Sequence, residues 1–190
     1  MSTNKIIFQT IIPEESFQRI QEQSKYSHDI LDAVELFSRE FQIDITTDKD
    51  IINGYERDSS NIKGHGDILC RPKNELECAL ILHWSQYFQI PITISAGKTN
   101  LTGSATPKGG IILSTEKMTQ PRVKVDPIAN TVSTPVGIYL EDMRKEVLRQ
   151  SNKTLHFPVD PTSREEAMVG GTLSCNASGF IPGPAGATRY

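Results

Sequence analysis

The stretch ISAGKTNLTGS, residues 94–104, begins at the end of a β-branched run that is typical of a strand. Most of its residues are small or carry a hydroxyl group, so a phosphate group can approach the backbone closely. Backbone N–H groups that converge in such a loop bind anions, chiefly phosphate. The stretch therefore predicts a phosphate-binding loop, and a plain glycine-containing turn between two strands is the alternative.

A nucleotide triphosphatase P-loop is a much weaker interpretation of the same residues. That motif requires a glycine where this chain has Ile92, and it requires a helix directly afterwards. Gly103 and Pro107 oppose such a helix, because both residue types disfavour a helix interior.

Two stretches near the end of the chain carry a second signal, FPVDPTS at 157–163 and VGGTLSCNASG at 169–179. The prolines stiffen the first stretch. Gly170 and Gly171 permit positive φ and the close approach of a flat ligand. Asn176 offers a donor and acceptors to the edge of a heterocycle. Taken alone, each stretch is equally consistent with a plain turn.

The pattern of apolar residues around these stretches predicts an α+β fold. Strands are expected at 68–70, 92–95, 110–114, 123–126 and 131–136, the last two forming a hairpin. Helices are expected at 74–88, capped by Asn74, at about 139–149, and as a pair within 13–41. Strand 68–70, helix 74–88 and strand 92–95 make a β-α-β unit, which implies parallel strands.

Each expected helix has an apolar face. In helix 74–88 the face is Leu76, Ala79, Leu80, His83 and Tyr87; in helix 139–149 it is Leu140, Met143, Val147 and Leu148. In the N-terminal pair, Phe17, Ile20 and Ser24 follow one another in the first helix. The second helix is capped by Asp29, and its face is Leu31, Val34, Leu36 and Phe37.

The order of these signals resembles one family, the flavin-linked oxidases with a PCMH-type (vanillyl-alcohol-oxidase-like) FAD-binding domain. The strand, phosphate-type loop, second strand, hairpin, helix, Phe-Pro-x-Asp-Pro and Gly-Gly-x-x-x-x-Asn-Ala-x-Gly match in sequence order. The sequence is most similar to the D-lactate and glycolate dehydrogenase branch. The resemblance runs from about Tyr55 to Tyr190, so residues 1–54 are a helical lead-in and residues 55–190 are the domain. It implies a β-α-β subdomain followed by a mixed sheet with flanking helices.

The resemblance implies three groups of cofactor contacts. The residues expected to wrap the FAD pyrophosphate are Ser95, Ala96, Gly97, Lys98, Thr99, Asn100, Leu101 and Gly103. The residues expected near the flavin and its ribityl chain are Pro158, Asp160, Pro161 and Ser163. The residues expected along the isoalloxazine ring are Gly170, Gly171, Thr172, Asn176 and Gly179. Tyr55, Asp58 and the turn at 64–67 match the start of the domain.

The phosphate-type loop departs from the family pattern at its start. Relatives commonly have Arg-Gly-Gly-Gly where this chain has the residues Ser-Ala-Gly-Lys at 95–98. Lys98 either supplies the missing positive charge or points into solvent. Because residues 95–103 include no His or Cys, the resemblance implies that FAD is held non-covalently. Near the end of the chain, Asn-Ala-Gly-Gly is relaxed to Asn-Ala-Ser-Gly at 176–179.

The resemblance also implies an activity. The chain is expected to be the N-terminal part of a FAD-dependent oxidoreductase that oxidises a small 2-hydroxy acid, such as D-lactate or glycolate, by hydride transfer to flavin. Electrons would pass to a quinone, a cytochrome or another flavoprotein. The enzymatic alternative is an alkyl-dihydroxyacetonephosphate-synthase-like flavoenzyme. The alternative from another class is a non-catalytic flavin-binding fragment.

The chain ends directly after a Gly/Pro-rich loop, so we expect the domain to be incomplete at its C-terminus and the chain alone to be inactive. In relatives the acid/base histidine and the arginines that bind the substrate lie further on. The histidines of this chain, His28, His65, His83 and His156, are therefore interpreted as structural. No catalytic residue is assigned.

The composition argues against several other classes of protein. The 20 Lys and Arg against 23 Asp and Glu give a net charge of −3, which argues against a nucleic-acid-binding protein. The three cysteines share no C-x-x-C spacing, so neither a disulfide framework nor a metal site is predicted. No apolar stretch is long enough to cross a bilayer. A cytoplasmic location is expected, and peripheral attachment to the inner face of a membrane is left open.

Overall fold

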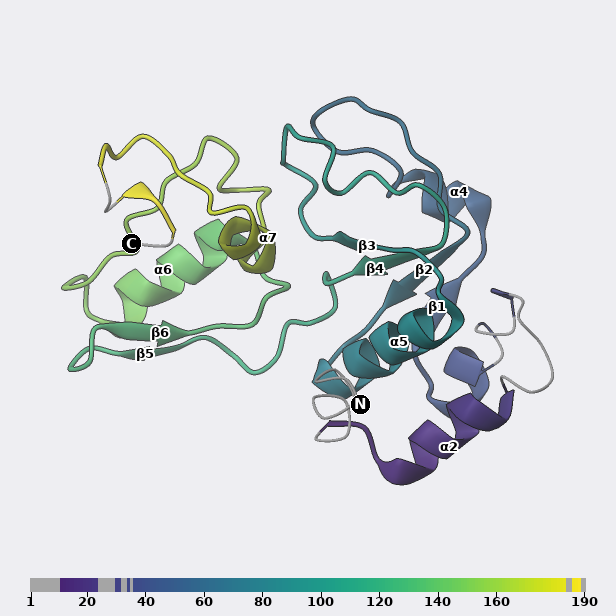
Figure 1. The fold of residues 1–190 in the computed structure, drawn as a ribbon. Coiled ribbons are helices and arrows are strands. Elements are labelled where there is room, and N and C mark those ends of the chain that lie inside the picture. Colours follow the sequence, from purple (N-terminus) through teal and green to yellow (C-terminus); the bar gives the residue numbers. More distant parts are fainter. Residues whose placement is uncertain (1–10, 24–29, 32–33, 35, 184–185, 189–190) are drawn as a thin grey trace.

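The computed structural model describes residues 11–23, 30–31, 34, 36–183 and 186–188 (Figure 1). In chain order its elements are α2 (Glu14–Gln23), the π-helix η1 (Leu36–Glu40), β1 (Asp44–Thr46), α4 (Lys49–Asn53), β2 (Ile68–Arg71), α5 (Glu75–Phe88), β3 (Ile92–Ser95), β4 (Ile111–Ser114), β5 (Lys124–Asp126), β6 (Thr131–Ser133), α6 (Leu140–Gln150) and α7 (Val169–Ser174). The α+β prediction is confirmed. Figure 1 shows the hairpin β5–β6 with α6 and α7 to one side of the four-stranded sheet.

The sheet is mixed, with the strand order β1-β2-β4-β3. Strands β2 and β3 both pair in parallel with β4, which lies between them, whereas β1 pairs antiparallel with β2. The predicted β-α-β unit is therefore confirmed. Strand β4 and most of β2 are fully buried because helices cover both faces of the sheet, which explains their uninterrupted apolar sequences.

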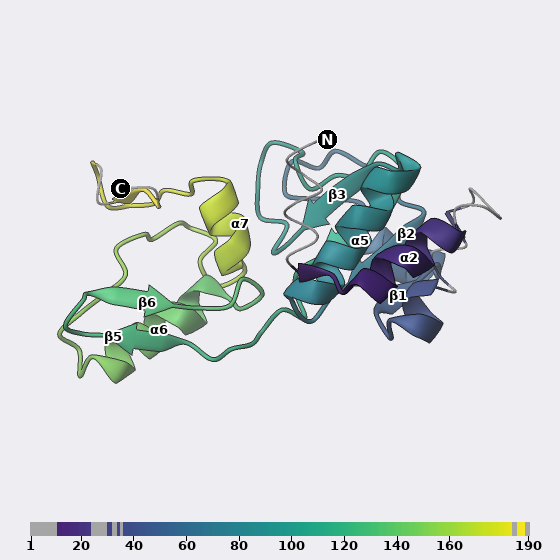
Figure 2. The same ribbon diagram turned by 60° about the horizontal axis from the view of Figure 1, so that its bottom comes forward.

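The two faces of the sheet bury alternate residues of the same strands. Ile68 and Cys70 of β2 face the main core, which α5, α2 and η1 close. Figure 2 shows α5 and α2 together on this side of the sheet. Leu69 points the other way and packs with its register partner Ile112 against Ile52 of α4.

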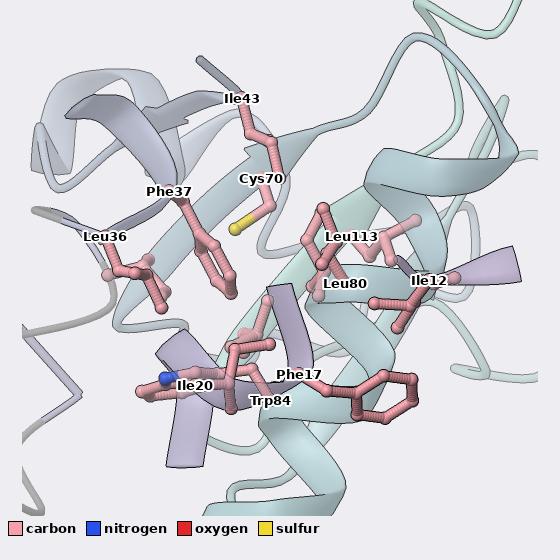
Figure 3. Close-up of a cluster of buried hydrophobic side chains, with 14 residues drawn as sticks. Ile12, Phe17, Ile20, Leu36, Phe37, Ile43, Cys70, Leu80, Trp84 and Leu113 are labelled. Atoms are coloured by element: carbon pink, nitrogen blue, oxygen red, sulfur yellow. The ribbon is translucent and has the colours of Figure 1, made fainter. Parts of the chain in front are cut away.

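Residues from the expected lead-in belong to the main core (Figure 3). Phe37 is fully buried and meets the ring of Trp84 edge-on at a centroid distance of 5.7 Å. Ile20 of α2 is also fully buried in the same cluster. The described residues among the first 54 therefore complete the core of the sheet, with β1 as its edge strand.

Helix α5 begins where Asn74 predicted it. The Asn74 side chain accepts a hydrogen bond from the backbone N–H of Glu77 at 2.9 Å, and the Glu77 carboxylate accepts one from the backbone N–H of Lys73 at 2.8 Å. The predicted apolar face is wrong at its edges, because Leu76 and Tyr87 are exposed. The core instead takes Ile81 and Trp84 along with Ala79 and Leu80, since the wide indole ring fills the space beside the N-terminal segment.

The helical pair is confirmed only in its first member, α2. Among the described residues of the expected second helix, Val34 is helical and the π-helical turn η1 follows it, and Ile43 N donates to Phe37 O directly after that turn. Both Leu36 and Phe37 are buried there, as predicted from their spacing. Ser24, His28 and Asp29 lie outside the described residues.

The predicted hairpin and the helix after it are confirmed as β5–β6 and α6. Leu140, Met143 and Val147 are buried against the valines of the hairpin, whereas Leu148 is exposed, contrary to prediction. Helix α7 was not predicted. It contains Gly170 and Gly171, which do not adopt the positive φ that glycine permits.

An ion cluster joins β1 and β2 at their cross-strand pair, Asp44 and Arg71. The Arg71 guanidinium donates to Asp44 at 2.9 Å, and Lys117 donates to the other carboxylate oxygen. Burial raises the pKa of Asp44, but these hydrogen bonds outweigh burial and bring the pKa below its ordinary 3.8. The stabilisation is therefore present above pH 3.8 and is lost as the pH falls through the lower pKa of the folded state.

We expect Asp44→Asn to lower the free energy of unfolding by about 1 kcal/mol at pH 7. Urea denaturation of both proteins at pH 7 and at about pH 3 measures this difference. The difference should shrink at the lower pH, because the Asp44 carboxylate is protonated there in the unfolded chain, which removes part of the stabilisation of the charged folded form. An equal difference at both pH values would contradict the assignment of charge to this cluster.

Candidate functional site

A cavity of about 970 Å³ lies where the loop after β3 faces α7. One wall is formed by Ala96 to Leu101 with Ser104 and Ala105, and the other by residues 161–163, 167–168 and 170–180 apart from Asn176. These are the two stretches that carried the sequence signals. The structure brings them together across the gap between the sheet and the α6–α7 part.

Two glycines let the walls meet at the base of the cavity. A Cβ atom on Gly97 would lie 2.4 Å from the carbonyl oxygen of Glu166, and one on Gly171 would lie 3.3 Å from the Cβ of Ala96. The backbone of the loop therefore touches the backbone just before α7. A side chain at position 97 would push the two walls apart.

The backbone N–H groups of the loop are uncommitted. From Ala96 to Ser104, no backbone N–H donates a hydrogen bond to any residue that the structure describes. Lys98 and Gly103 have positive φ, at 56° and 74°, so the chain turns sharply at both places. Partly buried amides without partners are costly unless an acceptor reaches them. An anion is the acceptor that suits such a loop.

The Lys98 side chain turns back behind the loop. Its ammonium group donates to Gly54 O at 2.6 Å and lies 4.4 Å from the ring centre of Tyr55. The Tyr55 hydroxyl in turn donates to the carboxylate of Glu116 at 2.8 Å. Burial, together with the Glu116 carboxylate, raises the pKa of Tyr55. Lys98 is thus tied to the residues behind the loop.

The Phe-Pro loop is held by α6. The carboxylate of Asp160 accepts hydrogen bonds from Arg144 at 2.8 Å and Arg164 at 2.9 Å, and Arg144 also donates to Val159 O. The backbone N–H of Leu140, at the start of α6, donates to Ala167 O. These contacts fix the segment between α6 and α7 and leave Pro161, Thr162 and Ser163 at the cavity.

Most of the predicted cofactor residues line the cavity. They are Ala96, Gly97, Lys98, Thr99, Asn100, Leu101, Pro161, Ser163, Gly170, Gly171, Thr172 and Gly179. The structure places the others away from the lining: Ser95, Gly103, Pro158, Asp160 and Asn176. The Asp160 carboxylate instead accepts hydrogen bonds from the two arginines. Asn176 lies just beyond α7 and has φ 48°. Although Thr172 borders the cavity, its hydroxyl donates to Met168 O inside the helix.

Three lining residues that the sequence analysis did not single out determine the chemistry of the far wall, which is apolar and carries one thiol. Phe180 is 70% exposed and Leu173 50% exposed, so the cavity presents bare apolar surface next to the uncommitted amides. Cys175 is the third, and its free thiol is exposed. The expectation of non-covalent binding considered only residues 95–103, whereas the fold brings this cysteine to the same cavity. None of His65, His83 and His156 lines the cavity.

The site thus combines an anion-binding loop with an adjoining apolar wall, a pairing that suits a ligand with both a phosphate and a flat ring system. Comparison with known proteins gives the same result, because residues 66–189 match the model of a family described as FAD binding domain. The chain belongs to this family of FAD binding domains. The predicted resemblance is confirmed at the level of the family and of the PCMH-type fold.

The curated relatives of this FAD binding domain include several named for 2-hydroxy acids. A D-lactate dehydrogenase of Archaeoglobus fulgidus is 34% identical over 113 residues, which are 59% of this chain and 24% of that protein. A glycolate oxidase subunit of Bacillus subtilis is 30% identical over 124 residues, 65% of this chain and 26% of that protein. The chain thus spans about a quarter of the length of these relatives.

Solved structures share the fold at low identity. An alkyldihydroxyacetonephosphate synthase has a TM-score of 0.70 at 19% identity, covering 84% of this chain and 31% of its own. The 6-hydroxy-D-nicotine oxidase of Arthrobacter nicotinovorans has a TM-score of 0.60 at 16% identity, covering 77% of this chain and 31% of its own. These likenesses show the fold of the FAD binding domain.

Among the described residues there is no group of His, Cys, Asp or Glu side chains that could hold a metal ion. No helix in the part of the chain that the structure describes is long and apolar enough to span a membrane.

Proposed function

We propose that this chain binds FAD non-covalently, with the pyrophosphate on the loop that follows β3 and the isoalloxazine ring beside α7. The uncommitted backbone amides from Ala96 to Ser104 carry this proposal, because they would give the phosphate oxygens donors that nothing else in the described structure uses. Gly97 and Gly171 would let the cofactor lie close to the main chain. Leu173 and Phe180 would cover apolar ring surface.

We further propose that the protein is the N-terminal part of a flavoenzyme that oxidises a small 2-hydroxy acid such as D-lactate or glycolate. When bound, FAD supplies the acceptor for a hydride from the substrate α-carbon. The residues of this chain hold and orient the cofactor, and the apolar wall keeps water from it. The printed names of relatives at 34% and 30% identity support this substrate class. The structural likeness to an alkyldihydroxyacetonephosphate synthase, at 19% identity, supports the fold alone.

Fluorescence titration with FAD, FMN and riboflavin tests the cofactor proposal. We expect FAD to bind at least about 100-fold more tightly than riboflavin, because only FAD has the pyrophosphate that the amides would bind. FMN, with one phosphate, should fall between them. Equal binding of FAD and riboflavin would contradict the role of the loop, and no binding of FAD by the folded chain would contradict the proposal itself.

Acid precipitation of the FAD-loaded chain tests whether attachment is non-covalent. The flavin should remain in the supernatant after the protein is pelleted. A yellow pellet would overturn this part of the proposal, and Cys175→Ser would then show whether the cavity thiol is the point of attachment.

We propose that Lys98 lies behind the pyrophosphate and does not contact it, because the Lys98 ammonium group is held by Gly54 O and the Tyr55 ring. Lys98→Met is therefore expected to raise the Kd for FAD by no more than about threefold, since no direct charge-assisted hydrogen bond to the cofactor is lost. The same titration measures this. A loss of about 30-fold or more would instead show that Lys98 turns to the pyrophosphate when FAD binds.

A further inference from the structure

Asp58 is a buried carboxylate directly behind the loop that follows β3, and it is 7% exposed. One carboxylate oxygen accepts hydrogen bonds from the backbone N–H and the hydroxyl of Ser60. The other accepts hydrogen bonds from the Asn100 side-chain amide at 2.7 Å and from the backbone N–H of Ala105 at 3.3 Å. Asp58 thus binds its own turn with one oxygen and the loop with the other.

The neighbouring Ser59 extends this attachment. Its backbone N–H donates to Lys98 O at 3.0 Å, and its hydroxyl donates to the same oxygen at 3.2 Å. The loop is therefore held at its start by Ser59 and at its middle and end by Asp58. All of these contacts use loop carbonyls, the Asn100 side chain or the Ala105 amide. None of them uses the backbone N–H groups from Ala96 to Ser104.

We propose that Asp58 is the positioning residue of the loop, fixing its backbone so that the amides from Ala96 to Ser104 stay free for an anion. This inference rests on the proposed binding of FAD pyrophosphate for its functional meaning, whereas its structural part concerns the loop alone. Asp58 does not line the cavity, and it acts through Asn100 and Ala105, which do.

Because Asp58 is charged, the direction in which its neutralisation changes FAD affinity tests the proposal. A buried carboxylate behind an anion-binding loop repels the anion, so neutralising it without moving the loop would strengthen FAD binding. Burial raises the pKa of Asp58, but the hydrogen bonds from Ser60, Asn100 and Ala105 outweigh burial and lower it, so the group is charged at neutral pH. A positioning role predicts the opposite effect on binding.

Asp58→Asn keeps the shape of the side chain but turns one acceptor oxygen into a donor. The new amide NH₂ must then face either the donors of Ser60 or those of Asn100 and Ala105, and the hydrogen bonds on that side are lost. We expect the Kd for FAD to rise by about tenfold or more. We also expect hydrogen exchange at Ala105 to become faster, because its backbone N–H donates to Asp58, with little change at β2 and β4. Thermal unfolding confirms that the variant is folded.

Asp67→Asn is the control for the loss of a negative charge at an exposed position. The Asp67 carboxylate also accepts a backbone hydrogen bond, from Gly110 N at 2.6 Å, and the substitution removes the same charge from a neighbouring loop. It should leave exchange at residues 98–105 unchanged and alter the Kd for FAD by less than about twofold.

The outcomes separate this inference from the proposed function. If folded Asp58→Asn binds FAD as well as or better than the wild type, with unchanged exchange in the loop, the positioning role is wrong. If the wild type binds no FAD, the proposed function fails, and the exchange measurement alone decides whether Asp58 orders the loop. Weaker binding with faster exchange across the whole sheet would show general destabilisation and also overturn the proposal.

Discussion

Replacing Gly97 with alanine is expected to weaken FAD binding by about 100-fold, equivalent to about 2.7 kcal/mol. The new Cβ would lie 2.4 Å from Glu166 O and 3.0 Å from Met168 N, both of which are backbone atoms. Neither can turn aside as the end of a flexible side chain would. The loop must therefore move away from the segment before α7, and the amides of the loop would no longer face the apolar wall.

Fluorescence titration with FAD measures this loss, and Gly54→Ala is the control. Gly54 ends α4 with helical φ, and a Cβ there would meet only Ile51 O, at 3.3 Å. This control should bind FAD nearly as the wild type does. Unchanged FAD affinity in a folded Gly97→Ala variant would show that the contact between loop and segment does not shape the site.

Gly179→Ala is expected to have the second largest effect, with FAD affinity falling by about 10- to 100-fold. A Cβ at this position would lie 1.8 Å from Asp160 O and 2.0 Å from Asp160 C. The segment at 177–180 must then separate from the Phe-Pro loop, and the hydrogen bond from Phe180 N to Asp160 O would break. The far wall of the cavity depends on that contact, because both segments contribute to it.

Gly186→Ala is the control that shows whether an equally severe backbone clash outside the cavity also weakens FAD binding. A Cβ on Gly186 would lie equally close to a backbone oxygen, 1.8 Å from Ile181 O, but Gly186 does not line the cavity. Isothermal titration of both variants should show a large loss of FAD affinity for Gly179→Ala and a small one for Gly186→Ala. Similar losses for the two would mean that the Gly179 contact is not specific to the site.

The sequence predicts best where local chemistry and tertiary packing agree. Strands β2 and β4 are continuously apolar because both faces are covered, and α5 starts at Asn74 because the cap satisfies an N-terminal amide. The two stretches that line the cavity were also recognisable, because their small residues and glycines were expected to let a ligand approach the backbone. At Gly97 the structure shows a close approach to the backbone of Glu166, which the sequence did not predict.

The sequence predicts poorly where a distant contact decides the conformation. Gly170 and Gly171 favour a loop by propensity, yet they lie in α7, where Gly170 packs on Val136 and Gly171 on Ala96. From the sequence, Asp160 is expected to contact the cofactor. In the structure its carboxylate accepts hydrogen bonds from Arg144 of α6 and from Arg164, and the sequence does not show that these arginines lie nearby. The short strand β1 carries no apolar run, and its pairing with β2 is what makes it a strand.

The most direct test of the central claim observes the backbone amides of the loop in an ¹⁵N-labelled chain while FAD is added. The account predicts that the amide signals of residues 96–104 shift together on binding and that their hydrogen exchange slows, because the phosphate oxygens become their acceptors. Riboflavin at saturating concentration should move the signals near α7 and leave those of the loop in place. Saturation with FAD that shifts only the signals near α7 would contradict the claim that this loop holds the pyrophosphate.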